Sequence, residues 1–250
     1  MPYGMYISAE GAQVQSQRLE IIANNLANVD TVGFKRELSI LQARYAEAVQ
    51  QGSAEPGSGS INDLGGGVQF QQTKTDFSPG PLRRTGAPTD VALPGEGFFL
   101  VRKGQETFLT RAGNFRLTAA GELVTQQGYP VLGESNSPVT IQKENGPWTI
   151  SDRGAVSQAG SSQDLALVQP ASPGDLVKVG DNLFRPLGPV RPVAAAQRAV
   201  AGGYLEMSGV QPTTEMTSLI EASRILEANI NVLKSQNQML DGLITRILKA

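Results

Sequence analysis

Carboxylates are the side chains of this sequence that could perform acid–base chemistry, because the chain contains no histidine and no cysteine. These two absences exclude thiolate nucleophiles, Cys/His zinc sites and Ser-His-Asp triads, but leave carboxylates and lysines available. Asp90, Glu96, Glu122 and Asp152 lie scattered through the middle of the chain. Their spacing allows an acid pair like that of a glycosidase, but solvated surface groups are the favoured interpretation.

Two glycine-containing runs resemble phosphate-binding loops in composition only. The GGG at 65–67 is not followed by Gly-Lys-Ser/Thr, and a predicted strand comes next instead of a helix. The GEG at 95–97 lacks the third glycine and the following helix of a dinucleotide-binding turn. We therefore predict no catalytic residue, no cofactor and no metal site, although the carboxylates and lysines leave an enzyme open as the less favoured class.

Charge and composition limit the possible partners. The net charge is −2 and no basic block is present, so we expect no nucleic-acid partner. No run of 18 or more apolar residues exists, so we expect no direct membrane insertion. The first residues lack the charged start and apolar middle of a cleaved signal peptide, so the sequence alone indicates a soluble cytoplasmic protein.

A long helix is predicted for the C-terminal residues, from about Thr213 onward. At roughly 37 residues it would be about 55 Å long. Its apolar residues alternate in steps of three and four over about four and a half heptads, which is typical of a coiled-coil seam. Polar residues in such a seam can fix register and partner number. The predicted seam consists of Met216, Leu219, Ser223, Leu226, Ile230, Leu233, Asn237, Leu240, Ile244 and Ile247.

The N-terminal residues show the same period with smaller side chains, which would let a second helix approach closely. This helix ends with Asn24, Asn25 and Asn28, although asparagine is a mediocre helix former. Asn28 can end the helix, and Gly33 permits a sharp turn. The asparagines therefore serve either as a helix cap with a turn or as contacts to other subunits. The predicted N-terminal seam consists of Met5, Ala9, Ala12, Ser16, Leu19, Ala23 and Leu26.

The middle of the chain has a different texture. Residues 37–67 are predicted to be a linker or extension, because residues 50–67 read QQGSAEPGSGSINDLGGG. Residues 68–205 contain short strand-like runs separated by turn residues, which predicts an all-β domain. Within it, FRLTAAGELVT (115–125) predicts a hairpin turning near Ala120-Gly121. Phe98 and Phe99 are adjacent in a predicted strand, so one should pack the core and the other should face a neighbouring molecule.

The sequence therefore predicts an α+β fold in which long, coiled-coil-type terminal helices pack together and an all-β domain is inserted between them. Its segments are an N-terminal assembly helix (1–36), a linker or extension (37–67), an all-β outer domain (68–205) and a C-terminal assembly helix (206–250). The two helical seams could instead pair within one molecule and close a monomer.

Three stretches carry a family resemblance. ANNLANVDTVGFKR (23–36) resembles the N-terminal signature of the bacterial flagellar axial proteins, the rod and hook family. TGAPTDVALPGEGFFLV (85–101), followed by residues 108–133, resembles the central β motif of that family. Residues 203–233 resemble its C-terminal helix signature. The matches lie in family order and cover roughly half of the chain.

The resemblance implies a structural subunit and not an enzyme. Such proteins leave the cytoplasm through the flagellar export apparatus without a cleaved signal peptide, which replaces the cytoplasmic expectation above. In the periplasmic space they assemble helically with other rod subunits into the basal-body rod, the drive shaft between motor and hook. Their terminal helices form the inner tube and the β domain lies outside.

The chain length and the run DNLFRP at 181–186 resemble proximal-rod members most, with distal-rod members second and hook-type subunits also possible. Gly209, Pro94 and Glu96 depart from the commonest family pattern. A remote alternative is a secreted β-domain enzyme or ligand-binding module with coiled-coil ends. The subunit-assembly residues that the resemblance and the seams imply are Leu19, Ala23, Asn24, Asn25, Leu26, Asn28, Gly33, Phe34, Met216, Leu219, Leu226, Ile230, Leu233, Asn237, Leu240, Ile244 and Ile247.

Overall fold

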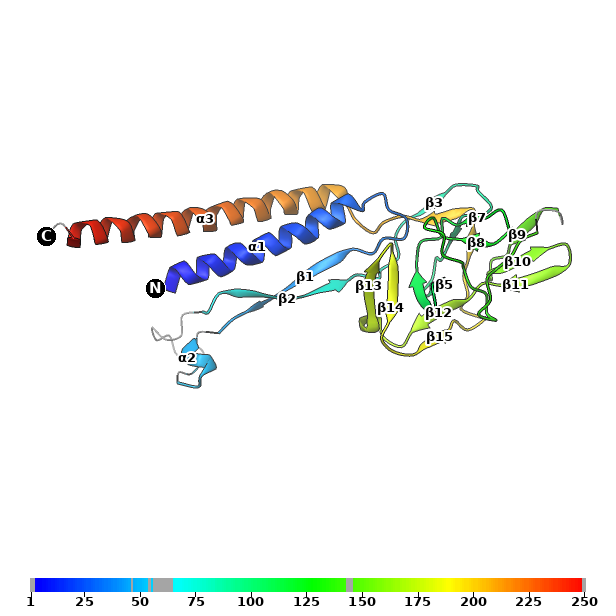
Figure 1. Ribbon diagram of the computed structural model, residues 1–250, viewed down its shortest axis with the longest axis horizontal. Helices are drawn as coiled ribbons and strands as arrows, with labels where there is room; N and C mark the ends of the chain where they lie inside the picture. The colour runs from blue at the N-terminus through cyan, green and yellow to red at the C-terminus, as the bar shows by residue number, and fades with distance from the viewer. Residues whose placement is uncertain (1–2, 46, 54, 56–64, 143–145, 249–250) are drawn as a thin grey trace. The chain divides into compact units, whose positions relative to one another are not determined.

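The computed structural model describes residues 3–45, 47–53, 55, 65–142 and 146–248, with a helix near each end and a β-rich middle (Figure 1). The chain divides into two compact units. The helical unit comprises residues 1–27, 37–76 and 210–250, and the β unit comprises residues 28–36 and 77–209. The chain therefore passes between the units at 27/28, 36/37, 76/77 and 209/210. The predicted α+β class is confirmed.

Two long helices form most of the helical unit. Helix α3 spans Pro212–Leu248 and has 37 residues, the length that the heptad pattern predicts. Pro212 occupies its first position, where a missing backbone N–H is tolerated because that donor has no partner within a helix. Helix α1 spans Tyr3–Ala27 and ends one residue before Asn28, whose carbonyl oxygen accepts a hydrogen bond from the Thr31 N–H at 3.2 Å.

A β-hairpin completes the helical unit. Strand β1 (Glu37–Ala43) pairs antiparallel with β2 (Val68–Thr75), and the register shifts between Ile40 and Leu41. Helix α2 (Glu47–Gln50) follows β1.

The segments thus differ from those expected from the sequence. Residues 37–43 are a strand where a linker was expected, because their backbone groups pair with β2. Residues 28–36 lie in the β unit instead of ending the N-terminal helix, and β2 lies outside the β unit. Most of the glycine- and serine-rich part of the expected linker, 54 and 56–64, falls outside the described residues.

A six-stranded antiparallel sheet is the centre of the β unit, in the order β13-β14-β6-β5-β12-β15. Strands β5 and β6 form a hairpin closed by the two-residue turn Gly104-Gln105, since Lys103 pairs with Glu106. The six strands are β5 (Phe98–Lys103), β6 (Glu106–Thr110), β12 (Leu167–Pro170), β13 (Leu176–Gly180), β14 (Leu183–Pro186) and β15 (Val190–Pro192).

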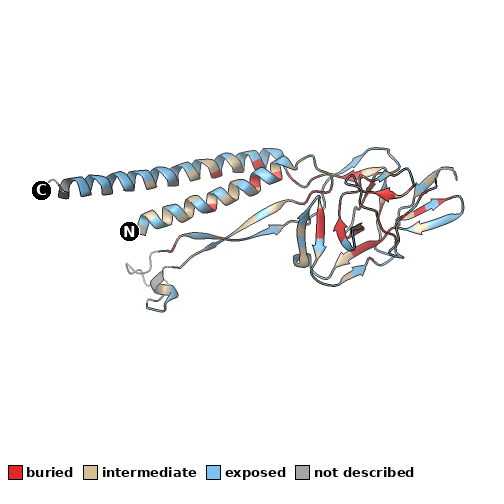
Figure 2. Cartoon of the chain, viewed as in Figure 1, coloured by how far each residue is buried: buried red, intermediate tan, exposed pale blue. Residues whose placement is uncertain are grey.

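Both faces of this sheet are buried, and Figure 2 shows the buried residues concentrated in the β unit while α3 is mostly exposed. Phe99 lies in the larger apolar cluster with Val101 and Leu123. Phe98 lies in a second cluster with Phe184 on the other face. The prediction that one of the two phenylalanines faces a neighbour is therefore wrong, because Phe77 and Phe184 of the same chain pack against Phe98.

Short strand pairs surround the sheet. The predicted hairpin near Ala120-Gly121 is confirmed, since β7 pairs antiparallel with β8 on either side of this turn. The 3-10 helix η3 (Pro173–Asp175) precedes β13. The remaining strands are β3 (Leu82–Arg84), β4 (Val91–Ala92), β7 (Arg116–Leu117), β8 (Leu123–Val124), β9 (Trp148–Ile150), β10 (Ala155–Gln158), β11 (Ser161–Asp164), β16 (Ala201–Gly202) and β17 (Tyr204–Glu206); they pair as β7-β8, β11-β10-β9, β16-β4 and β17-β3.

Candidate assembly surfaces

The β1–β2 hairpin is fastened along α1 at two places. At one end, the Asn25 side chain hydrogen-bonds both backbone groups of Glu37. At the other end, the Arg44 guanidinium donates hydrogen bonds to Glu10 and to the Tyr6 hydroxyl. Fifteen residues of helix and seven of strand each span about 23 Å, so the two elements match in length. The hydrogen bond that Arg44 donates to Tyr6 and the nearby Glu10 charge raise the pKa of Arg44 above its ordinary value.

Helices α1 and α3 lie side by side and antiparallel (Figure 1). The side-chain amide of Gln236 lies over Gly4, and that of Asn229 lies over Gly11. Arg18 Nη2 lies 4.0 Å from Glu221 Oε2. From Gly4 to Gly11 to Arg18 the α1 numbers rise by seven each time, while the facing α3 numbers fall by seven and then by eight, so both helices advance along the contact at nearly the same rate.

The residues of α3 that face α1 are not those of the predicted seam. Each lies one position before a predicted seam residue, as Glu215 does before Met216 and Asn229 before Ile230. The α1-facing positions repeat every seven residues at Glu215, Ala222, Asn229 and Gln236, of which the first two are fully buried. The predicted leucines of the seam, Leu219, Leu226, Leu233 and Leu240, are half-buried.

The other predicted seam residues of α3 remain exposed. Met216, for example, is 55% exposed. Each of Met216 and Ile230 follows an α1-facing position by one residue, which places it about 100° around the helix from α1. The exposed members of the predicted seam are Met216, Ile230, Asn237, Ile244 and Ile247.

A second exposed apolar row on α3 was missed by the sequence analysis. Ile225, Val232 and Met239 recur every seven residues, and each follows an α1-facing position by three. This spacing places them about 60° from α1 on the opposite flank. A second heptad register, tested beside the first, would have found them. Helix α3 therefore carries an apolar flank on each side of α1.

The predicted α1 residues divide into two groups. Leu19 and Leu26 are half-buried, and Ala23 and Asn24 are exposed. The α1 face with the deepest burial instead includes Val14, Ile22 and Asn25. It differs from the predicted N-terminal seam because α1 must also cover the β1–β2 hairpin.

The predicted residues after α1 have partners within the β unit. Asn28 Oδ1 accepts a hydrogen bond from the Thr31 hydroxyl at 3.1 Å. Gly33 is buried with φ +68°, and an added Cβ would lie 2.5 Å from the Ala112 backbone nitrogen. Phe34 is buried, and the Lys178 ammonium lies 4.1 Å from the centroid of its ring.

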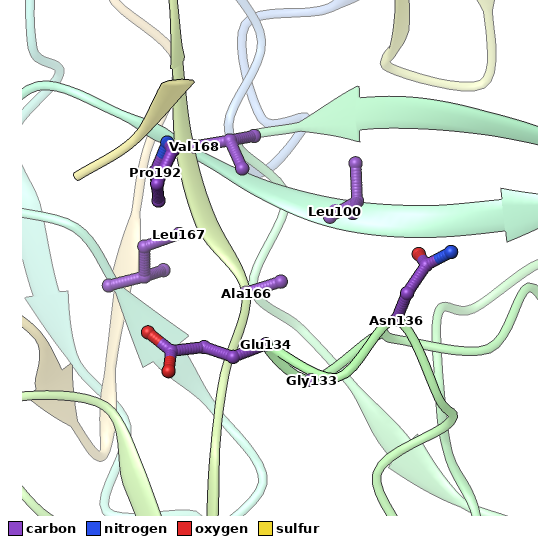
Figure 3. Close-up of a pocket in the computed structure, with 8 residues that line it drawn as sticks. All are labelled: Leu100, Gly133, Glu134, Asn136, Ala166, Leu167, Val168 and Pro192. Atoms are coloured by element: carbon purple, nitrogen blue, oxygen red, sulfur yellow. The ribbon is translucent and has the colours of Figure 1, made fainter. Parts of the chain in front are cut away.

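The β unit has surface depressions, and in one of them the polar groups do not converge on one point. This depression has a volume of about 400 Å³ and is lined mainly by apolar residues including Leu100, Leu167 and Val168. Figure 3 shows the Glu134 carboxylate and the Asn136 amide at different ends of this depression. Glu134 is also ion-paired with Arg198.

Two features of the described ranges bear on other functions. In these residues, no three Asp, Glu, His or Cys side chains come together in a group that could hold a metal ion. Neither terminal helix, over its described length, has a stretch apolar enough to cross a bilayer.

Three family models match the chain in sequence order. The model described as "Flagella basal body rod protein" matches residues 5–35. The model "Flagellar hook protein FlgE/F/G D1 domain" matches 92–158, and "Flagellar basal body rod FlgEFG protein C-terminal" matches 201–246. Together they place the chain in the class of flagellar axial proteins, with both long helices and the β unit represented.

Full-length relatives define the family more closely. The chain is 31% identical to "Flagellar basal-body rod protein FlgF" of Caulobacter vibrioides over 100% of this chain and 99% of the relative. It is 31% identical to "Flagellar basal-body rod protein FlgG" of Bacillus subtilis over 96% and 97%, respectively. It is 32% identical to FlgG of Agrobacterium fabrum over 97% and 98%.

The chain belongs to the flagellar basal-body rod protein family. It is a structural protein of the flagellar basal body and not an enzyme, and membership implies assembly with other rod and axial proteins.

Proposed function

We propose that this protein is a subunit of the proximal rod, which assembles helically through its two terminal helices and lies in the periplasmic space after passage through the flagellar export apparatus. Support for the proximal position comes from the FlgF relative, whose alignment includes all 250 residues of this chain. The FlgG relatives match at similar identity, so a distal-rod position is the second candidate.

The observation that carries the assembly proposal is the pair of apolar flanks on α3. Met216 and Ile230 lie on one flank, and Ile225, Val232 and Met239 lie on the other. Removing such a side chain from water contributes about 1.5–3 kcal/mol when burial is complete. Helix α3 has an apolar flank on either side of the face that contacts α1, so it can pack against two further helices in the manner of a coiled coil. A subunit inside a tube must make such contacts with neighbours on both sides.

The end of α3 supports the same assignment. Gly4 of α1 lies opposite Gln236, so the last part of α3 has no α1 residue beside it. This part exposes Leu243, Ile244 and Ile247, of which Ile247 is 73% exposed. We propose that neighbouring subunits cover this overhang. Ala23 and Asn24 are exposed on α1 and are proposed to make the corresponding contacts there.

The test places one aspartate on each flank, as Ile230→Asp and as Val232→Asp, with Asn231→Asp as the matched control. All three residues are exposed, so each variant should fold. Asn231 follows the α1-facing Asn229 by two residues, which places it about 160° from α1, on the far side of α3. Each protein is expressed in cells that lack the native subunit, and basal bodies are purified and analysed by mass spectrometry. We expect both flank variants to be absent from basal bodies and the control to be present.

Normal incorporation of both flank variants would refute assembly through α3. The axial position is tested separately by labelling Gln105, in the exposed β5–β6 turn, and locating the label in electron micrographs of basal bodies. Label at the motor end supports the proximal assignment. Label near the hook end replaces it with the distal one.

A further inference from the structure

A carboxylate, Glu206, is buried in the β unit between two cations. Lys35 Nζ lies 2.6 Å from Glu206 Oε1, and each of these side chains is 1% exposed. Arg111 Nη1 lies 3.3 Å from Glu206 Oε2, and the Arg111 side chain is 3% exposed. We refer to Glu206, Lys35 and Arg111 as the ion cluster. Its two cations and one carboxylate are shielded from water, so their attraction is much stronger than at a surface.

The ion cluster holds backbone from several distant parts of the chain. Lys35 Nζ also donates a hydrogen bond to the Ser78 carbonyl oxygen at 2.8 Å. The Gly80 N–H donates to Glu206 Oε1 at 2.9 Å. The Gly33 N–H donates to the main-chain carbonyl of Glu206 at 2.7 Å. Segments near 33–35, 78–80 and 206 therefore meet at a single residue.

These segments are the ones that lead out of the β unit. Residues 28–36 connect to the helical unit at both ends, residue 77 follows a passage from it, and residue 209 precedes another. Every passage between the two units therefore lies within a few residues of a group that the ion cluster holds. The arrangement is not explained by local folding, because Lys35 and Glu206 are 171 residues apart in sequence.

The segment 28–36 is also fastened to the six-stranded sheet. Asn182, between β13 and β14, donates a hydrogen bond from Nδ2 to the Val32 carbonyl oxygen at 2.8 Å. Lys178 of β13 donates from Nζ to the Lys35 carbonyl oxygen at 3.0 Å, and its ammonium lies over Phe34. The ion cluster is therefore joined to the largest element of the β unit.

Stability alone does not account for three buried charges. Replacing a buried ion pair by apolar side chains is often neutral or stabilising, whereas removal of one partner is costly. Burial lowers the pKa of Arg111 from its ordinary value, and the charges of Glu206 and Glu96 act in the opposite direction. Buried charged side chains must each stay in one defined position to remain paired, whereas apolar side chains that pack together do not have this requirement.

We propose that the ion cluster is a clasp that gathers the four chain passages, so that force entering the β unit through any one of them is shared by all. If force acts on one connecting segment alone, the hydrogen bonds that hold this segment to its unit can break one after another. Passages that are joined at a buried charge must break that contact first. The load-bearing consequence rests on the rod function proposed above, but the joining of the segments does not.

The first test uses amide hydrogen exchange on the unmodified full-length chain in increasing, sub-denaturing urea. If the ion cluster joins the segments, the Gly33 and Gly80 amides should open together, with one free energy and one dependence on urea. Opening of Gly33 at lower urea than Gly80 would overturn the proposal. No substitution is needed, so failure to fold cannot obscure the result.

The second test compares Lys35→Met with the control Arg185→Met, which removes an exposed ion pair with Glu106 in the same unit. Lys35→Met leaves Glu206 paired with Arg111 in a charge-balanced arrangement, so the β unit should fold. We expect the Gly33 and Gly80 amides to exchange about tenfold faster or more, because charge-assisted hydrogen bonds are lost. Amides of the β5–β6 hairpin and all amides of the control should be unchanged. Unchanged exchange at Gly33 and Gly80 would contradict the clasp.

A third measurement addresses load. Cells whose subunit carries Lys35→Met should assemble rods and swim in ordinary medium, but should lose speed in viscous medium more than cells with the control variant. Equal speeds in viscous medium would overturn the load-sharing role while leaving rod membership intact. If the protein proved absent from rods, the exchange experiments would still decide whether the segments are joined.

Discussion

Asn25, near the end of α1, hydrogen-bonds both backbone polar groups of Glu37, the first residue of β1. Its Nδ2 donates to the Glu37 carbonyl oxygen at 2.8 Å, and its Oδ1 accepts from the Glu37 N–H at 2.9 Å. The side chain is fully buried. The amide thus acts as a piece of neighbouring strand and fixes where β1 begins. This gives one of the three clustered asparagines a purpose within the molecule.

Asn25→Asp should destabilise the helical unit. The substitution replaces the donor by a carboxylate oxygen that faces the Glu37 carbonyl oxygen in a buried place. We expect a loss of about 2 kcal/mol in the free energy of unfolding, since one hydrogen bond is lost and a charge is left unsatisfied. Urea unfolding followed by circular dichroism at the helix band measures the change. Gln13→Asp, at an exposed position of α1, is the control, and equal losses in both variants would count against the assigned role.

Gly33→Ala and Gly104→Ala separate backbone strain from steric conflict. Both glycines have similar positive φ, +68° and +66°. An added Cβ at Gly33 would lie 2.5 Å from Arg111 and Ala112 backbone atoms, whereas nothing lies within 4 Å of a Cβ at Gly104. We expect Gly104→Ala to cost about 1 kcal/mol from strain alone and Gly33→Ala about 3 kcal/mol or more. Thermal unfolding of both variants provides the comparison, and similar losses would show that the backbone near Gly33 adjusts freely.

Phe98→Ala should be costly although Phe98 and Phe99 point to opposite faces. Phe98 packs edge-to-face with Phe77 and Phe184, with ring centroids 5.7 and 5.8 Å apart, respectively. We therefore expect a loss of about 3–5 kcal/mol, typical of a buried phenylalanine. Val177→Ala in the edge strand β13 should cost much less, because Val177 is exposed. Chemical unfolding monitored by the fluorescence of Trp148 in the β unit reports both values. A loss below about 1 kcal/mol for Phe98→Ala would mean that its face of the sheet is open.

The C-terminal part of α3 should be the least protected part of that helix in the isolated protein. No residue of α1 lies beside α3 beyond about Gln238, and a helix without tertiary support is marginal in water. Hydrogen exchange should therefore be fast at residues 240–248 and slow at residues 215–230. Incorporation into basal bodies should remove this gradient. Equal protection of both ranges in the isolated chain would show that α3 needs no neighbour.

The sequence predicted much of the helical architecture because helix periodicity is a local property. The heptad pattern gave both the type and the length of α3, and turn residues located the hairpin at Ala120-Gly121. It did not reveal β1, since residues 37–43 form a strand only by pairing with β2, which begins 25 residues after β1 ends. Nor did it show which flank of α3 would face α1, because two heptad registers of apolar residues coexist there and only the partner helix distinguishes them.

The sequence by itself determined that two amphipathic helices frame a strand-rich region, and its motifs indicated the rod and hook family. Only the tertiary structure decided what the turn after α1 does. In the sequence, Lys35 is simply the middle residue of Phe34-Lys35-Arg36 after Gly33, and no residue beside Glu206 marks that carboxylate as special. The ion pair between them depends on burial and joins residues that are 171 positions apart in the sequence, and no local sequence pattern encodes such a contact. Periodicity reports which face of an element is apolar, whereas the pairing of buried charges is fixed only when the chain has folded around them.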